Sequence, residues 1–253
     1  MADTFALEVV TPERALWTGP AVALVLRTGE GNLTVLDGHT ALIGSVAPGE
    51  LVTIAGDGIG PAVGVFGTIG ASGSMPTNLG GVEVDFDAVA APLLYVQASQ
   101  LNAQVPYTVA GSAITQIAVQ YQGQVVGSAL GTVAQAAPGL FPVAINQDGS
   151  INSSVSPAPA GSVVTLFGTG EGLTNGPNQA GQPAAVPYPQ PLLAVGVSLG
   201  QTSLPLSYAG GAPGAVGLLQ VNCTLPGNAS SGTYPLVLSV GSFLSPSASL
   251  WIK

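Results

Sequence analysis

Hydrophobic and polar residues alternate in many short stretches of this chain, and glycine and proline separate the stretches. In VEVDF (82–86) the apolar residues take one side and the acids take the other. The same character recurs in TQIAVQY, SVVTLFG, LAVGVSL, GLLQVNCTL and YPLVLSV. A period of two in runs rich in β-branched residues predicts strands with one buried face. Since 36 glycines and 21 prolines leave room only for brief helices, such as 128–137, we predict an all-β fold.

The chain also contains a diverged copy of part of itself. Residues 48–60 (PGELVTIAGDGIG) align with 160–172 (AGSVVTLFGTGEG). Two further matches follow in the same order: APLLY (91–95) with LPLSY (204–208), and QLNAQVP (100–106) with QVNCTLP (220–226). The equivalent residues are Gly56 and Gly168, Gly58 and Gly170, Tyr95 and Tyr208, and Asn102 and Asn222. Repetition at a spacing of about a hundred residues predicts two domains of one fold.

Equivalence between the copies favours structural roles for these residues. The glycine loops GDGIG and GTGEG lack the G-x-G-x-x-G spacing, the following helix and the lysine of nucleotide-binding loops. We interpret them as turns with positive φ after the first strand of each copy. The tyrosines are expected to pack at a core or corner with the hydroxyl bonded to backbone, sugar stacking being the alternative, and the asparagines to cap a turn or strand end.

The repeat divides the chain into four segments. We predict a β-segment at 1–47, a β-sandwich at 48–132, a linker with a hairpin at 133–159, and a second sandwich at 160–253. Many short strands at close spacing are typical of sandwiches and not of alternating strands and helices. Within the linker, NQDGS is a turn signal.

The charge of the chain excludes several classes of partner. Only 6% of the residues are charged, the net charge is −9, and the basic residues are Arg14, Arg27 and Lys253 alone. Nucleic acids and anionic membrane surfaces are therefore not expected as partners. The chain has no run of 18 apolar residues, so we expect no membrane insertion, and its start lacks the features of a signal peptide. After Asp87 only two acids remain, Asp148 and Glu171, and such a neutral surface rich in Gly, Ala, Ser and Thr is typical of extracellular bacterial β-modules.

Residues suited to catalysis or metal binding are scarce. The single histidine, His39, has Asp37 near it in sequence, but no G-x-S-x-G turn exists. One histidine and the single cysteine, Cys223, do not suffice for a closed zinc site. Alternation in QVNCTL places Cys223 on an apolar face, where a buried, inert thiol is expected. We therefore expect no catalytic residue, no cofactor and no metal site, and a protein that is not an enzyme.

Acidic residues on one strand leave a weak calcium site open as an alternative. Glu83, Asp85 and Asp87 lie two apart on one strand face, with Asp57 as a further candidate. Calcium takes six to eight oxygen ligands, commonly from a loop that wraps the ion. A solvated strand face is the favoured interpretation.

Residues 48–253 resemble an uncharacterised family of C-terminal domains of large secreted proteins from soil bacteria. The resemblance rests on PGELVTIAGDGIGP, LGGVEV, APLLYVQASQLNAQVPY, AAPGLF, NQDGSINS, GSVVTLFGTGEG, LSYAGGAPG and LQVNCTLPGNASSGTYPLVLSVG. Each copy is also similar to the immunoglobulin-like domains shared by plexins and certain transcription factors. The resemblance implies immunoglobulin-like sandwiches displayed outside the cell, with no catalytic activity and no defined ligand. The turn DAVAAPL departs from the family in lacking the usual glycine.

Residues 1–47 resemble a different family, the epsilon subunit of the rotary ATP synthase. The matching strings are LEVVTPER, RTGEGNLTVLDGH and ALIG. This resemblance implies the start of a β-sandwich that contacts the gamma subunit and the c-ring, with Asp37, Gly38 and His39 in a rotor-facing loop. The match stops near Gly49, so the later strands and the helical hairpin of that family are missing and the sandwich is incomplete. The two resemblances meet at SVAPGELV, as in a chimera.

Two functions follow as expectations. The first is a non-enzymatic structural or adhesive module of a secreted or cell-surface protein, with a protein or surface polymer as its unknown partner. The alternative is an ATP synthase epsilon subunit, cytoplasmic and peripheral to the membrane, that supports proton-driven ATP synthesis through residues 1–47.

Overall fold

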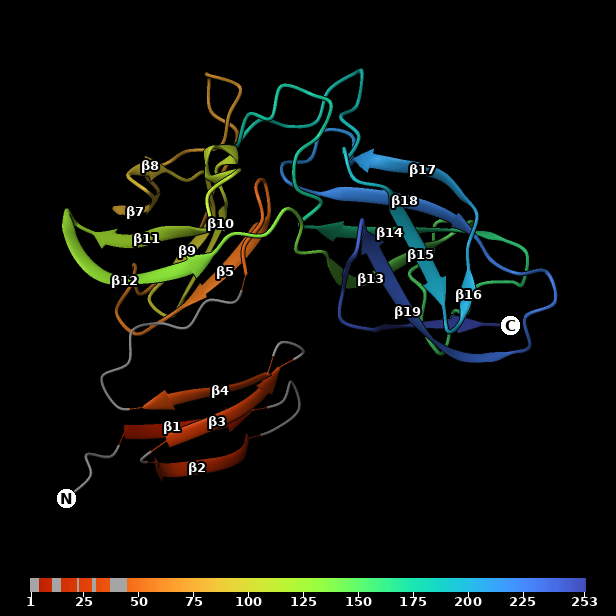
Figure 1. Ribbon diagram of the computed structural model, residues 1–253, viewed down its shortest axis with the longest axis horizontal. Helices are drawn as coiled ribbons and strands as arrows, with labels where there is room; N and C mark the ends of the chain where they lie inside the picture. The colour runs from red at the N-terminus through yellow and green to blue at the C-terminus, as the bar shows by residue number, and fades with distance from the viewer. Residues whose placement is uncertain (1–4, 11–14, 22, 29–30, 37–44) are drawn as a thin grey trace. The chain divides into compact units, whose positions relative to one another are not determined.

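The computed structural model describes residues 5–10, 15–21, 23–28, 31–36 and 45–253, in two compact units, Met1–Leu42 and Ile43–Lys253. In the first unit, β1 (Phe5–Val10) pairs antiparallel with β2 (Ala15–Ala21). Likewise β3 (Ala23–Thr28) pairs antiparallel with β4 (Gly31–Leu36) (Figure 1). The proposed rotor-facing residues Asp37, Gly38 and His39 lie outside the described residues.

Two β-sandwiches make up residues 45–253. The strands of the first are β5 (Leu51–Ala55), β6 (Val65–Phe66), β7 (Val82–Phe86), β8 (Val89–Ala90), β9 (Leu93–Gln97), β10 (Gln100–Gln104), β11 (Ile114–Tyr121) and β12 (Gln124–Thr132). They form one sheet in the order β5-β10-β9-β6 and another in the order β12-β11-β7-β8. A single 3-10 turn, η1 (Tyr107–Val109), follows β10.

The second sandwich has the same plan. Its strands are β13 (Gly139–Asn146), β14 (Val163–Thr169), β15 (Val195–Leu199), β16 (Thr202–Ser203), β17 (Leu206–Gly211), β18 (Leu219–Thr224), β19 (Gly232–Val240), β20 (Phe243–Leu244) and β21 (Ala248–Ile252). One sheet has the order β13-β14-β18-β17. The other has the order β16-β15-β19, and both β20 and β21 pair with β19.

This strand order is that of an immunoglobulin sandwich. In the second sandwich, β13, β14, β18 and β17 take the places of strands A, B, E and D, and β15, β19 and β20–β21 those of C, F and G. The first sandwich repeats the plan from strand B onward. Each sandwich also has a parallel bridge between its entering and leaving segments, Val46 with Val133 and Ala158 with Ile252. The predicted all-β fold with tandem sandwiches is confirmed.

Two segments differ from the sequence-based expectation. Residues 139–146, assigned to the linker, form β13 and pair with β14 as the first strand of the second sandwich. Residues 128–132, within the stretch compatible with a helix, continue β12 in its pairing with β11. A β-sheet partner satisfies the backbone of an apolar, glycine-containing segment better than an isolated helical turn would.

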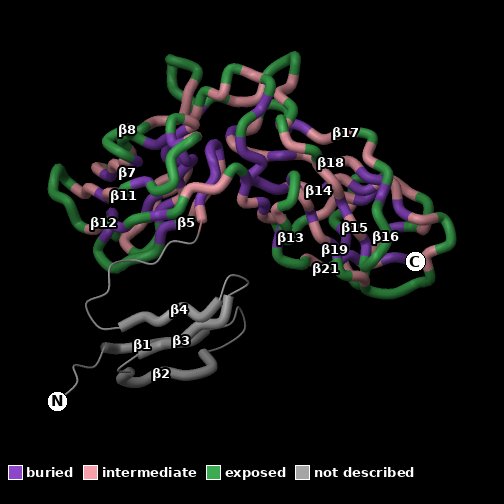
Figure 2. Tube along the Cα trace, in the orientation of Figure 1, coloured by how far each residue is buried: buried purple, intermediate pink, exposed green. Residues whose placement is uncertain are grey.

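Each sandwich has its own hydrophobic core between its two sheets (Figure 2). In β7 the apolar residues Val82, Val84 and Phe86 are fully buried, and the acids between them are not. The core of the second sandwich includes Leu166, Leu219 and further aliphatic side chains from both sheets. In the described part of the chain no helix has the length and apolar character needed to cross a membrane.

Candidate ligand site at the junction of the two sandwiches

The repeat-equivalent asparagines occupy matching positions on the inner strands of the sheets. Asn102 on β10 lies opposite Tyr95, and Asn222 on β18 lies opposite Tyr208. The Asn102 Oδ1 accepts a hydrogen bond from Gln100 at 2.9 Å, and Gln220 donates to Asn222 Oδ1 at 3.1 Å. Both asparagines therefore order a strand surface, and the structure does not bring them into a shared site.

The equivalent tyrosines make different contacts. The Tyr95 hydroxyl donates to Gln97 Oε1 at 2.6 Å, and its ring lies 4.8 Å from that of Phe66. The Tyr208 hydroxyl donates to the Gly211 carbonyl at 2.7 Å. Only the second tyrosine bonds to backbone in the way that the sequence reasoning expects.

The glycine loops adopt turns, and the turn of the second copy is closely packed. Gly58 and Gly170 have φ of +66° and +80°, whereas Gly56 and Gly168 do not have positive φ. A Cβ on Gly170 would lie 1.9 Å from the carbonyl oxygen of Ala137, but a Cβ on Gly58 would meet open space. The second glycine loop is therefore fixed against the segment that joins the two sandwiches.

The acids of β7 and of the turn that follows it are bonded to amide N–H donors. Asn78 donates to Glu83 at 2.7 Å and Gln120 donates to Asp85 at 2.8 Å. Asp87 Oδ1 accepts the backbone N–H of Gln116 at 2.8 Å. Nowhere in residues 45–253 do three or more His, Cys, Asp or Glu side chains gather in a group that could hold a metal ion.

A long loop between β14 and β15 builds a candidate site. Its base is closed by an antiparallel bridge between Thr174 and Pro191 and by the Asn175 N–H, which donates to the Gln190 carbonyl at 2.9 Å. Within it, Asn178 Oδ1 accepts from both the N–H and the hydroxyl of Thr174, each at 2.9 Å. We call residues 171–191 the junction loop.

The junction loop and its neighbours bond the two sandwiches together. Gln104 on β10 donates to the Gly49 carbonyl at 3.0 Å and accepts the Gly181 N–H at 2.6 Å. Gly181 in turn accepts the N–H of Met75 at 2.8 Å. On β14, the Thr169 hydroxyl accepts from the Leu51 N–H at 2.8 Å and donates to the Gly217 carbonyl at 3.0 Å.

Two adjacent glycines on β17 let the junction loop approach the sheet. The Gly211 N–H donates to the Pro189 carbonyl at 2.8 Å. A Cβ on Gly210 would lie 2.9 Å from that carbonyl oxygen, and one on Gly211 would lie 2.9 Å from the Cβ of Ala184. Glycine at these two positions therefore allows the backbone of β17 to approach the junction loop closely.

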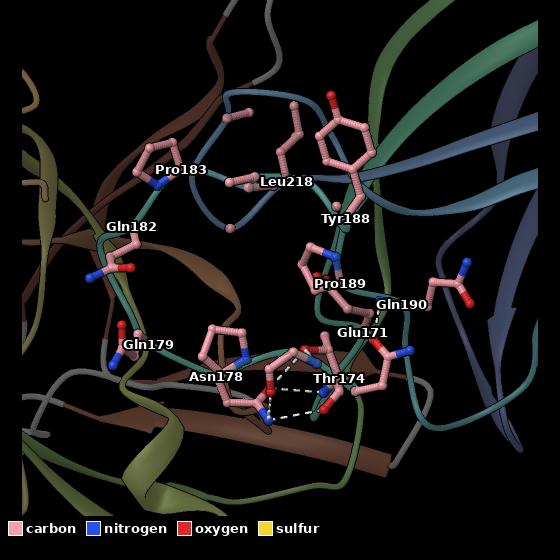
Figure 3. Close-up of a pocket in the computed structure, with 18 of the residues that line it drawn as sticks. Glu171, Thr174, Asn178, Gln179, Gln182, Pro183, Tyr188, Pro189, Gln190 and Leu218 are labelled. Carbon is pink, nitrogen blue, oxygen red and sulfur yellow. Dashed lines mark hydrogen bonds between the residues drawn. The ribbon is translucent and has the colours of Figure 1, made fainter. Parts of the chain in front are cut away.

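A cavity of about 570 Å³ opens inside the junction loop. Figure 3 shows Gln179 and Gln182 on one side of it and Tyr188 and Pro189 on the other. Its volume lies within the range of about 300–1,000 Å³ that is usual for ligand pockets. Glu171 is the only charged residue among those that line the cavity in the described part of the chain.

A buried acid, Glu171, and a half-buried acid, Glu50, lie at the junction. Burial raises the pKa of Glu171 from 4.5 to about 7. Burial also raises the pKa of Glu50 to about 7, against the opposing effect of its hydrogen bond from the Ala47 N–H at 2.7 Å. Burial, and then the charge of Glu171, hold the pKa of Tyr107 well above its usual range. Burial therefore favours the protonated form of the Glu171 and Glu50 carboxyls.

Cys223 belongs to the core of the second sandwich and not to the junction. Its side chain is fully buried on β18, and burial raises the pKa of its thiol to about 12. A buried thiol with so high a pKa is a poor nucleophile.

Sequence reasoning missed the junction. Glu171 was visible as one of two acids after Asp87, and an isolated acid in a neutral segment is a signal of a special environment. Gln104 and Thr169 carried no such signal, because their partners lie 48 or more residues away in sequence.

Comparison with known proteins supports the resemblance of the N-terminal segment. The sequence model for the family described as ATP synthase, Delta/Epsilon chain, beta-sandwich domain matches residues 4–67. The match extends beyond residue 47 and includes β5 and β6, which pair with strands of the first sandwich.

Curated relatives agree with this family match. The ATP synthase epsilon chain of Frankia casuarinae is 46% identical over 46 residues, which are 18% of this chain and 54% of the relative. That of Sinorhizobium fredii is 36% identical over 78 residues, which are 31% of this chain and 57% of the relative. The chain spans about half the length of these relatives.

Solved structures give low overall similarity. The Bacteroides ovatus mixed-linkage glucan utilization locus protein SGBP-B, in complex with a mixed-linkage heptasaccharide, matches 98% of this chain and 63% of its own, with 11% identity and a TM-score of 0.36. Domains 4–9 of the surface layer protein SbsC match 97% of this chain and 37% of their own, with 13% identity and a TM-score of 0.24. The fold assignment rests on the strand order and not on these similarities.

Proposed function

We propose that residues 45–253 act as a non-enzymatic structural and adhesive module, displayed outside the cell, in which two immunoglobulin-type sandwiches hold one fixed orientation. The observation that carries this proposal is the set of side chain–backbone hydrogen bonds at the junction, in which Gln104 and Thr169 each bond to backbone of both sandwiches or their loops. Buried bonds of this kind are costly to leave unmade, because each broken bond leaves a desolvated polar group.

The module suits display because its surface carries little charge and its junction presents a shaped loop. A rigid pair of domains keeps two binding surfaces at a set spacing and loses little conformational entropy when it binds. Candidate acid, base and nucleophile groups arranged for catalysis are not among the described residues that line the junction cavity, where Glu171 is the only charged group.

A distance measurement between the sandwiches tests this proposal. In the full chain with Cys223→Ala, spin labels are attached to cysteines at Gln124 and Ser230, which are both exposed. Pulsed electron resonance should give one narrow distance distribution. Adding Gln104→Ala should broaden it, whereas Gln116→Ala on the exposed side of β11 should not. A broad distribution in the parent chain, or no difference between the two variants, would contradict a fixed orientation.

A second function is favoured by the family match at residues 4–67. In this proposal the N-terminal segment binds the rotor of an ATP synthase, through the gamma subunit and the c-ring, as an epsilon chain would. The test is retention of the full chain by an immobilised gamma subunit with its c-ring. Retention of the parent chain that is lost in the double variant Asp37→Ala, His39→Ala would support the rotor function. Passage of the parent chain through the column without retention would oppose it.

A further inference from the structure

The cavity inside the junction loop is lined by a buried acid, one of whose carboxyl oxygens has no hydrogen-bond partner among the described residues. Glu171 lines the cavity, is only 6% exposed, and its Oε2 has no hydrogen-bond partner among the described residues. Buried polar atoms are satisfied in the great majority of cases, so an unpartnered carboxyl oxygen beside a cavity is unusual. Oε2 is itself covered by neighbouring atoms, so a ligand in the cavity can bond to the Glu171 carboxyl only through its other oxygen. A carboxyl accepts hydrogen bonds when ionised and can also donate one when protonated.

The other polar groups around the cavity are neutral. Gln179, Gln182 and Gln190 lie on exposed parts of the junction loop and are among the residues that line the cavity, with Gln179 and Gln182 on one side of it (Figure 3). An amide both donates and accepts hydrogen bonds, as a hydroxyl does. With Glu171 as the only charge in the lining, an anionic ligand would meet no counter-ion and a repelling carboxyl.

Flat apolar surfaces complete the lining. Tyr188 and Pro189 are half-buried on one side, and Leu218 and Pro183 also contribute. Rings of this kind pack against the C–H faces of a ligand, while the tyrosine hydroxyl remains available for a hydrogen bond. The cavity therefore combines neutral hydrogen-bonding groups, one buried carboxyl and flat apolar faces.

We propose that this cavity binds a neutral, hydroxyl-rich ligand of the oligosaccharide class, with a ligand hydroxyl bonded to the carboxyl of Glu171. A ligand hydroxyl matches either protonation state of the carboxyl, because it can donate or accept. An ammonium ligand would instead require the charged carboxylate, which burial disfavours at this position. This inference rests on the proposed adhesive function and names its partner class.

The junction loop is built to keep the cavity open. Its base is bonded through Asn175 and Gln190, and its far part is bonded through Gly181 to Gln104. The Ala184 N–H donates to the Ala215 carbonyl at 2.8 Å, and Ala184 accepts the Gly214 N–H at 2.9 Å. A preformed site of this kind binds with a small entropic loss.

Affinity electrophoresis of the full chain provides the test. Native gels contain hydroxyethyl cellulose, xylan, galactomannan or dextran as neutral polysaccharides, with polygalacturonate and chitosan as charged comparisons. At least one neutral polysaccharide should retard the parent chain. Glu171→Leu removes both carboxyl oxygens and should weaken the binding by roughly tenfold or more, whereas Glu171→Gln keeps a hydrogen-bonding group and should lose much less.

A second pair of variants guards against a folding defect. Tyr188→Ala removes the flat face and should reduce retardation, while Tyr188→Phe keeps the ring and should retain most of it. Tyr234→Ala on β19, away from the cavity lining, is the matched control and should migrate as the parent does. Thermal melting of each variant establishes that it is folded.

Three results would overturn the inference: no retardation by any neutral polysaccharide, retardation by chitosan alone, or equal retardation of folded Glu171→Leu and parent. The spin-label distance between the sandwiches is measured on the same proteins. A narrow distribution without polysaccharide binding would reject the oligosaccharide site and leave the fixed orientation standing. A broad distribution would reject the fixed orientation instead.

Discussion

Replacing Glu171 with glutamine should stabilise the protein at pH 8 and change its stability little at pH 5. Burial raises the pKa of the folded carboxyl from 4.5 to about 7. Because the folded pKa exceeds the unfolded value, the protonated carboxyl contributes stability that is fully present below about pH 4.5. That stability is lost as the pH rises through about 7. The neutral amide of glutamine has no such dependence.

The magnitude follows from the same shift. A rise from 4.5 to about 7 corresponds to about 3 kcal/mol at 1.36 kcal/mol per pKa unit. Linkage places most of this, roughly 2–3 kcal/mol, between pH 5 and pH 8. Glu50 shifts in the same direction, and the charge of Glu171 is one of the causes of its raised pKa. The glutamine variant should therefore also lower the pKa of Glu50.

Guanidinium unfolding at the two pH values is the assay. The chain has two tryptophans, so Trp17→Phe leaves Trp251 on β21 as the fluorescent reporter of the second sandwich. The control is Glu83→Gln on β7, an acid away from the junction. A parent chain that is more stable at pH 8 than at pH 5 would refute the reasoning. So would an equal effect of Glu171→Gln at both pH values.

Three further results are expected. Gly170→Ala should lower the free energy of unfolding by several kcal/mol, because the residue has a φ of +80° and the new Cβ would collide with the carbonyl oxygen of Ala137. The control Gly123→Ala has a φ of +75° but open space around the new Cβ, so it should cost about 1 kcal/mol. Cys223 should react with a maleimide only after unfolding, and rapid labelling of the native chain would contradict its burial. Asn152→Ala should lower the free energy of unfolding by roughly 2–4 kcal/mol, because the Asn152 amide bonds both the N–H and the carbonyl of Trp251. An unchanged denaturant midpoint would refute this.

The sheets were predictable from the sequence because a half-buried strand alternates. VEVDF (82–86) alternates in sequence and in burial, and the internal repeat required the second sandwich to follow the plan of the first. The first strand of the second sandwich was not predictable in the same way. Its sequence GLFPVAIN (139–146) contains a proline and does not alternate, and the register with β14 shifts between Leu140 and Ala144.

The junction was less predictable, because its contacts are specific and distant in sequence. Gln104 is an ordinary strand residue by composition, and its two backbone partners lie 55 and 77 residues away. The glycines at 210 and 211 lie within β17 and admit the backbone at Pro189. The periodicity of a sequence does not specify which loop packs against a given strand.

The parallel bridges described for each sandwich have a mechanical consequence. Val46, where the chain enters the first sandwich, pairs in parallel with Val133, where it leaves, and Ala158 pairs in the same way with Ile252. When two parallel segments are pulled from opposite ends of the chain, the load acts along the strands, so that the backbone hydrogen bonds break together and not one after another. We therefore expect each sandwich to resist stretching more strongly than a hairpin that opens from one end. A pulling experiment with optical tweezers that gave only gradual extension at low force would contradict this.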